Sequence, residues 1–377
     1  MKKIFITGMG IISNVGVTLE ELWSNLNKSS IDDISEYTLP IKIPLIISKP
    51  EVRRMSRYAY MAVYSTKIIA DKRDDRKSKL DRDKTGTIFN TGYGPLSTNI
   101  KFGESVIKGN ADFASPTVFS STVSNACVGN VCMINQLKGP STILLGSNNI
   151  GYSYELIRDG LADGIFTGGI EEYCRELFQS FEEISSTNTY INEGFRISEG
   201  AATILMESLD EKSEEYQELK EEIFCEIIGY SDKNMGAHPA VLGNIEFDSD
   251  VFASNMESLL KAENIKAEDV ELIVNAKSGI RKSDEAEAIA IKKIFSKEVL
   301  QISPKRVVGE TLGASLTINT VIAALCLKQQ AVPSLLSKDN SQINKTIRYA
   351  IVNGYDVSGN TTSILLKAVD KGDINNE

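Results

Sequence analysis

The chain has little of what metal and imidazole chemistry needs. Its 377 residues include one tryptophan and one histidine, His238. A single imidazole excludes histidine-rich metal sites and leaves one side chain for histidine-dependent catalysis. The five cysteines are scattered, odd in number and without a CxxC pair. This pattern argues against a disulfide framework and a cysteine-rich zinc site. We therefore expect a reducing, cytoplasmic location.

Charge and hydropathy argue against a nucleic-acid-binding protein and against a membrane-spanning one. Lys and Arg number 41 against 51 Asp and Glu, and the net charge of −10 disfavours non-specific binding to nucleic acid or anionic membrane. The most apolar stretch, 318–327, contains Asn319 and is shorter than a membrane span. Gly8, Gly10 and Asn14 interrupt the apolar N-terminal run, so no signal peptide is expected. With 42% hydrophobic residues, the chain can bury a large core.

Strand-like and helix-like segments alternate along the chain, which predicts an α/β protein. Strands are expected at 3–7, 85–90, 142–145, 164–169, 224–230, 270–275, 301–303, 349–353 and 361–366. Helices are expected at 18–26, 56–72, 123–137, 151–159, 252–263, 284–295 and 316–329. The charge run 210–222 is interpreted as a solvated face. It separates two parts that each open with a strand, so we predict two halves, 1–222 and 223–377.

Two local motifs allow a functional and a structural interpretation. Gly8-x-Gly10 follows a strand, as in dinucleotide sites, but Gly16 comes too late for GxGxxG, so turn glycines are expected. Cys127 precedes an apolar helix, where a thiolate would be activated. Cysteine in such a place is also often buried for packing alone. The local sequence leaves both interpretations of Cys127 open.

A series of short segments recurs in one order from end to end of the chain. They are IFITGMGIISNVG (4–16), EELW (20–23), RRMSRY (53–58), KGP (138–140), GLAD (160–163), GGIE (168–171), NA (275–276), K with GETLGA (305–314) and the turn 355–361. Together they resemble the β-ketoacyl-carrier-protein synthases. The resemblance implies a thiolase-like, five-layered αβαβα fold of two related halves.

The resemblance also implies that the family's catalytic residues are missing. The position of the nucleophilic cysteine falls on Asn148, and the two histidines are replaced by Lys277 and Glu310. The segment 140–160 is shorter than in the family by roughly one and a half helical turns. Decarboxylative condensation needs a thiolate and donors for the developing negative charge. We therefore expect no catalytic residue.

Other nucleophiles and bases do not replace the missing set. Ser147 stands beside the nucleophile position but lacks a general base. Cys127 precedes the KGP segment, so the resemblance places it on the preceding helix, as a structural residue. His238 matches neither histidine segment. Lys277 and Glu310 are expected to form a buried ion pair that fills the former catalytic pocket.

This pattern is similar to the chain-length factors, the β subunits of type II polyketide ketosynthases, although those usually carry Gln where this chain has Asn148. The resemblance implies a heterodimer with an active ketosynthase, which shapes the tunnel for a polyketide or polyene chain. It also implies an acyl carrier protein that carries the substrate on phosphopantetheine, and no cofactor of the chain's own. No nucleic acid or membrane partner is expected.

The resemblance places the chain-length gate at Pro95, Thr98 and Phe102. Thr98 and Phe102 share a helix face at i, i+4 spacing, but ordinary dimer packing would produce the same pattern. Two alternative functions remain. One is an acyltransferase or hydrolase of the same fold that uses Cys127 or Ser147, and the other is a homodimeric acyl-binding scaffold.

Overall fold

The computed structural model describes residues 2–33, 39–53, 55–109, 114–146, 148–187, 195–234, 248–295, 299–356 and 359–369. The strands are β1 (Lys3–Ile12), β2 (Thr85–Thr91), β3 (Ser141–Leu145), β4 (Gly164–Glu171), β5 (Gly200–Leu209), β6 (Cys225–Asn234), β7 (Leu272–Val274), β8 (Leu300–Ile302), β9 (Ala331–Val332), β10 (Ile343–Asn344), β11 (Tyr349–Tyr355) and β12 (Asn360–Lys367). The helices are α1 (Leu19–Leu26), α2 (Lys49–Val52), α3 (Arg57–Asp74), α4 (Leu96–Lys108), α5 (Pro116–Phe119), α6 (Ala126–Asn135), α7 (Asn149–Arg158), α8 (Arg175–Thr187), α9 (Glu214–Leu219), α10 (Ser249–Ala262), α11 (Arg281–Ile294), α12 (Lys305–Val308) and α13 (Ser315–Gln329). The expected α/β alternation is confirmed.

The strand order repeats itself in the two parts of the chain. The large sheet has the order β3-β2-β4-β5-β1-β6-β12-β11-β7-β8. From each end inward, two parallel pairings are followed by two antiparallel pairings. The parts meet where β1 pairs with β6 at Phe5↔Glu226 and Ile6↔Cys225. The two parts thus share one topology, while the boundary between 1–222 and 223–377 stays a prediction.

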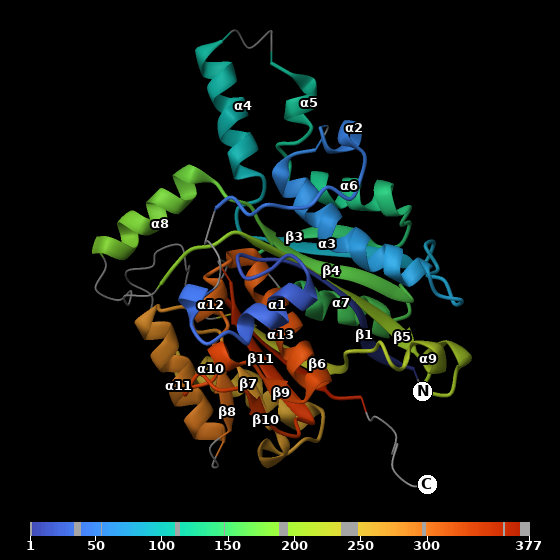
Figure 1. Ribbon diagram of the computed structural model, residues 1–377, viewed down its shortest axis with the longest axis vertical. Coiled ribbons are helices and arrows are strands. Elements are labelled where there is room, and N and C mark those ends of the chain that lie inside the picture. Colours follow the sequence, from blue (N-terminus) through green and yellow to red (C-terminus); the bar gives the residue numbers. More distant parts are fainter. Residues whose placement is uncertain are drawn as a thin grey trace.

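Helices divide the molecule into five layers (Figure 1). α3 packs on α6 and on β1 and β5, and α10 packs on α11 and on β6 and β12. α7 and α13 lie between the two parts of the sheet, because α7 contacts β4 and also β6, and α13 contacts β11 and also β4 and β5. This arrangement is the αβαβα architecture that the resemblance to the β-ketoacyl-carrier-protein synthases implies.

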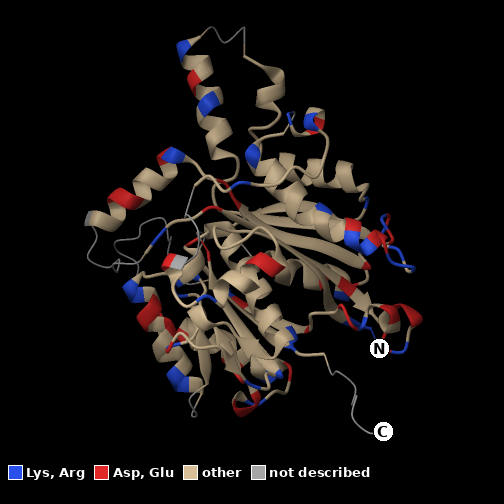
Figure 2. Ribbon diagram, viewed as in Figure 1, with Lys and Arg blue, Asp and Glu red and all other residues tan. Residues whose placement is uncertain are grey.

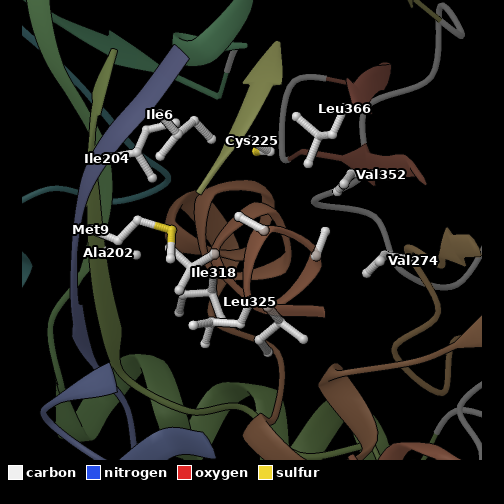
Figure 3. Close-up of a cluster of buried hydrophobic side chains, with 14 of the residues drawn as sticks. Ile6, Met9, Ala202, Ile204, Cys225, Val274, Ile318, Leu325, Val352 and Leu366 are labelled. Atoms are coloured by element: carbon white, nitrogen blue, oxygen red, sulfur yellow. The ribbon is translucent and has the colours of Figure 1, made fainter. Parts of the chain in front are cut away.

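α13 is the central core helix. It lies between Ile6 and Met9 of β1 on one side and Val352 of β11 on the other, and its Ile318 lies next to Met9 (Figure 3). A helix that is apolar all round is typical of such a buried position. The stretch Leu312–Gln329 is long and apolar enough to span a membrane, but 78% of it is buried inside the protein. The stretch 318–327 lies within this segment, and its burial in the core explains its apolar composition.

Gly8 and Gly10 lie within the first strand and have a packing role. β1 continues through Gly8 and Gly10 to Ile12, with a bulge between Ile6 and Gly8, so the expected turn was wrong. A Cβ on Gly10 would lie 2.1 Å from the carbonyl oxygen of Ser65 in α3. Glycine therefore allows α3 to approach the strand closely. Neither residue forms part of a dinucleotide turn.

The acidic run 210–222 is solvated on one side, where Glu211, Glu214 and Glu221 are exposed, while Tyr216 and Leu219 of α9 are buried. Two of its carboxylates pair with arginines at the basic end of α3. Glu215 pairs with the buried Arg73 at 2.8 Å, and Glu222 pairs with Arg76. The run therefore connects α3 electrostatically to the chain that enters the second half.

Candidate functional site

Asn148 occupies the N-terminus of α7, where the resemblance placed the nucleophile. Its buried side chain caps the helix, since Oδ1 accepts the Gly151 N–H at 2.8 Å. Its Nδ2 donates to both carboxylate oxygens of Asp232 in β6, at 3.1 and 3.0 Å. Asp232 also accepts a hydrogen bond from the Thr362 hydroxyl, and burial raises the pKa of Asp232. The helix terminus that would stabilise a thiolate is thus satisfied by the chain's own amide.

The neighbouring Asn149 joins the two core helices. Its Nδ2 donates to Thr167 Oγ1 in β4 at 3.0 Å and to Thr317 Oγ1 in α13 at 3.2 Å. The N-termini of α7 and α13, one from each half, therefore meet at this point. The position that the resemblance assigns to the nucleophile thus lies where the two parts of the sheet meet.

Glu310 precedes α13, and both of its carboxylate oxygens accept hydrogen bonds. Its Oε2 accepts a hydrogen bond from Lys305 Nζ at 2.7 Å, and the two side chains are 5% and 3% exposed. Its Oε1 accepts the Leu312 N–H at 2.8 Å and the Ser315 hydroxyl at 2.6 Å. The expected ion pair between Glu310 and Lys277 was wrong, because the partner of Glu310 is Lys305. The sequence contained both residues of the pair in one segment, but the comparison of histidine positions drew attention to Lys277.

Lys277 follows β7 and belongs to a second polar group. The adjacent Ser278 shares a hydrogen bond with the Tyr355 hydroxyl at 2.7 Å, and Lys305 Nζ lies 4.6 Å from the centre of the Tyr355 ring. Lys277 and Glu310 thus lie in the same corner without pairing. The positive charge of Lys277 acts on Asp284, where burial raises the pKa and this charge opposes the rise. These contacts depend on strands far apart in sequence, and no local pattern indicated them.

Cys127 is buried at the start of α6. Its thiol donates to the Ser124 carbonyl at 3.3 Å, and burial raises its pKa to about 12. Such a thiol is almost entirely protonated at neutral pH and is a poor nucleophile. Ser147 and His238 lie outside the described residues. In the described ranges, no group of three or more His, Cys, Asp or Glu side chains could hold a metal ion.

The gate candidates lie on a projecting pair of helices. Pro95 is buried at the start of α4, and Thr98 and Phe102 are half-buried along it. Phe102 packs against Phe119 of α5, with ring centres 5.5 Å apart. We call α4 and α5 the arm, because they extend from the body of the molecule (Figure 1). Phe102 therefore holds the two helices of the arm together.

Large apolar side chains are exposed along the arm and the adjoining sheet edge. Ile107 is 84% exposed on α4, Met133 67% exposed on α6, and Leu145 61% exposed at the end of β3, the last strand of the sheet. Phe119 at the end of α5 and Val123 between α5 and α6 are also exposed. Neither α5 nor α6 carries a charged residue (Figure 2). We call these five residues the apolar edge; exposed apolar groups of this kind mark interaction sites.

Comparisons with known proteins agree with this architecture. The model of the β-ketoacyl synthase C-terminal domain matches residues 224–339. A 3-oxoacyl-[acyl-carrier-protein] synthase 2 from Coxiella burnetii is 23% identical, with 90% of this chain and 89% of that protein covered. The same-named protein from Staphylococcus aureus is 26% identical, with 88% and 87% covered.

Solved structures show the same fold. The ishigamide ketosynthase/chain length factor superposes with a TM-score of 0.81 at 18% identity, covering 98% of this chain and 100% of that chain. A type II polyketide synthase acyl-carrier protein in complex with its ketosynthase gives a TM-score of 0.79 at 21% identity and the same coverage. The chain thus resembles the β-ketoacyl synthases along most of its length, and the solved structures show that it has the thiolase-like fold of these proteins.

Proposed function

We propose that the chain is a non-catalytic ketosynthase-like subunit, a chain-length factor that pairs with an active ketosynthase in a type II polyketide or polyene synthase. The observation that carries the proposal is the internal closure of the catalytic region. Asn148 caps α7, and Glu310 is buried against Lys305. A fixed carboxylate at Glu310 would also repel the negative charge that develops in condensation.

The apolar edge supports the proposed pairing with an active ketosynthase. A lone subunit would leave Ile107, Met133 and Leu145 in water, at a cost of about 25 cal/mol for each Å² that a partner could cover. An active ketosynthase that covers this edge would supply the nucleophile. The acyl chain would arrive on the phosphopantetheine of a carrier protein, and the arm with Pro95, Thr98 and Phe102 would border its tunnel. A cytoplasmic location belongs to the same proposal.

The test is co-expression with an intact ketosynthase encoded beside this chain, followed by native mass spectrometry. We expect a one-to-one heterodimer or a multiple of it, because the apolar edge needs a partner. The matched variant Met133→Glu/Leu145→Glu places charge on this edge without changing the core, and should prevent assembly. A stable homodimer that does not bind the ketosynthase would refute the proposal and favour an acyl-binding scaffold.

A further inference from the structure

Glu310 does more than neutralise Lys305. Its second oxygen holds the backbone of Leu312 and the hydroxyl of Ser315. Leu312 has a φ of 47°, in the left-handed region that side chains other than glycine rarely adopt. The carboxylate therefore stabilises a strained turn, Leu312–Ala314, that leads into α13.

This turn is locked to the first half of the molecule. The Gly313 N–H donates to Glu171 Oε2 at 3.2 Å, and the Asn90 amide donates to the Gly313 carbonyl at 3.1 Å. A Cβ on Gly313 would lie only 2.5 Å from the Cα of Thr91. With backbones this close, a shift of the turn must be transmitted to the end of β2.

Two buried glutamates continue the path to the arm. Glu171 accepts the N–H groups of Gly92 and Tyr93, at 2.8 and 3.1 Å. The next residue, Glu172, accepts the N–H of Ser97 in the first turn of α4 at 3.0 Å. The base of the arm is thus held by carboxylates, one of which also holds the turn that Glu310 stabilises.

We propose that Glu310 is a positioning residue, which acts through the Leu312–Ala314 turn and Glu171 to hold the arm in the geometry that receives the partner subunit. This inference rests on the proposed function, because it assumes that the arm meets a partner. The residue that replaced a histidine then has a structural role of its own in assembly. The competing account is that Glu310 only balances the charge of Lys305.

Two double variants separate these accounts. Lys305→Met/Glu310→Leu and Lys305→Met/Glu310→Gln both remove the buried ion pair, and such paired replacements leave stability nearly unchanged. Only the glutamine variant keeps an acceptor for the Leu312 N–H. Arg73→Met/Glu207→Leu removes another buried pair, 3.1 Å long and outside this path, and controls for a general loss of stability.

Two readouts are needed: the dissociation constant with the co-expressed ketosynthase, and amide hydrogen exchange at Gly92, Tyr93 and Ser97 in the isolated chain. The leucine variant should lose affinity about tenfold, as expected for the loss of a hydrogen bond to a charged group, with faster exchange at these amides. The glutamine variant and the Arg73 control should keep the wild-type affinity for the ketosynthase and the wild-type exchange rates at these amides.

Equal behaviour of the leucine and glutamine variants would overturn the inference. If the wild-type chain does not bind the ketosynthase, the proposed function fails instead. Amide exchange in the isolated chain then still decides whether Glu310 positions the arm.

Discussion

Asn148 shows how one side chain can hydrogen-bond a helix terminus and a carboxylate of a neighbouring strand together. Its side-chain oxygen accepts a hydrogen bond from a backbone N–H of α7, and its amide nitrogen donates to the carboxylate of Asp232. The Gly151 N–H is buried and depends on this cap, whereas Asp232 also accepts a hydrogen bond from Thr362. The position is therefore expected to contribute to stability mainly through the cap of α7.

Substitutions at Asn148 test this account. Asn148→Ala should lower the free energy of unfolding by about 0.5–2 kcal/mol, since the cap of α7 is lost and Asp232 loses one of its donors. Asn148→Asp keeps the cap acceptor but places a second carboxylate beside Asp232, so at pH 7 it should be less stable than Asn148→Ala. The difference in unfolding free energy between these two variants should be smaller at pH 5. Desolvation already raises the pKa of Asp232, and protonation of a carboxylate removes the repulsion. Urea unfolding at both pH values measures it, and a fully stable Asn148→Asp at pH 7 would contradict it.

At the scale of elements, local patterns predicted what is locally determined. Thr18 and Glu21 have the spacing of a capping box, which indicates the start of a helix. In the structure Thr18 Oγ1 accepts the Glu21 N–H, and the Glu21 carboxylate accepts the Val17 N–H. The role of Gly10 was not predictable in this way. It depends on Ser65 in α3, which meets β1 only after folding.

The close contact between β1 and α3 leads to a prediction. Gly10→Ala should lower the free energy of unfolding by about 1–3 kcal/mol, because the new methyl group overlaps the Ser65 carbonyl. Gly103→Ala is the matched control in α4, where a Cβ meets nothing within 4 Å. It should raise stability by up to about 1 kcal/mol through helix propensity. Thermal or urea unfolding compares them, and a neutral Gly10→Ala would show that α3 can move away.

At the scale of the whole molecule, the fold followed from the alternation of elements and the resemblance, whereas the site did not. The positions of Asn148, Lys277 and Glu310 were found by counting along motifs, but their partners were not. Asp232 became visible as a partner only once distant strands were brought together, whereas Lys305 lies in the same segment as Glu310 and was overlooked. A resemblance indicates which catalytic residue is missing, but the contacts of its replacement depend on the surrounding packing.

Buried acids should give the whole molecule an unusual dependence on pH. Burial raises the pKa of Glu171 to about 8 and those of Glu172 and Glu287 to about 7. An acid with a raised pKa holds its proton more tightly in the folded state. Its contribution to stability is therefore greatest below the ordinary glutamate pKa of about 4.3 and falls as the pH rises to the folded-state value.

The free energy of unfolding should consequently decrease between pH 5.5 and 8.5, by at most about 1.4 kcal/mol per pH unit for each group. Urea unfolding across this range measures the slope. Glu287→Gln should flatten the slope, and Glu257→Gln on the exposed side of α10 should leave it unchanged. Stability that rises with pH would contradict the assignment.

The position of the degenerate site at the junction of the two repeated halves has one more consequence. In an open catalytic cleft, the polar groups around the N-termini of α7 and α13 would be available to a bound substrate. Here they bind one another across the junction, through Asn148 to Asp232, Asn149 to Thr317, and Asn360 to the Gly146 carbonyl. These hydrogen bonds join the first part of the sheet to the second, so the polar groups at the position that the resemblance assigns to the nucleophile also hold the two repeated parts of the fold together.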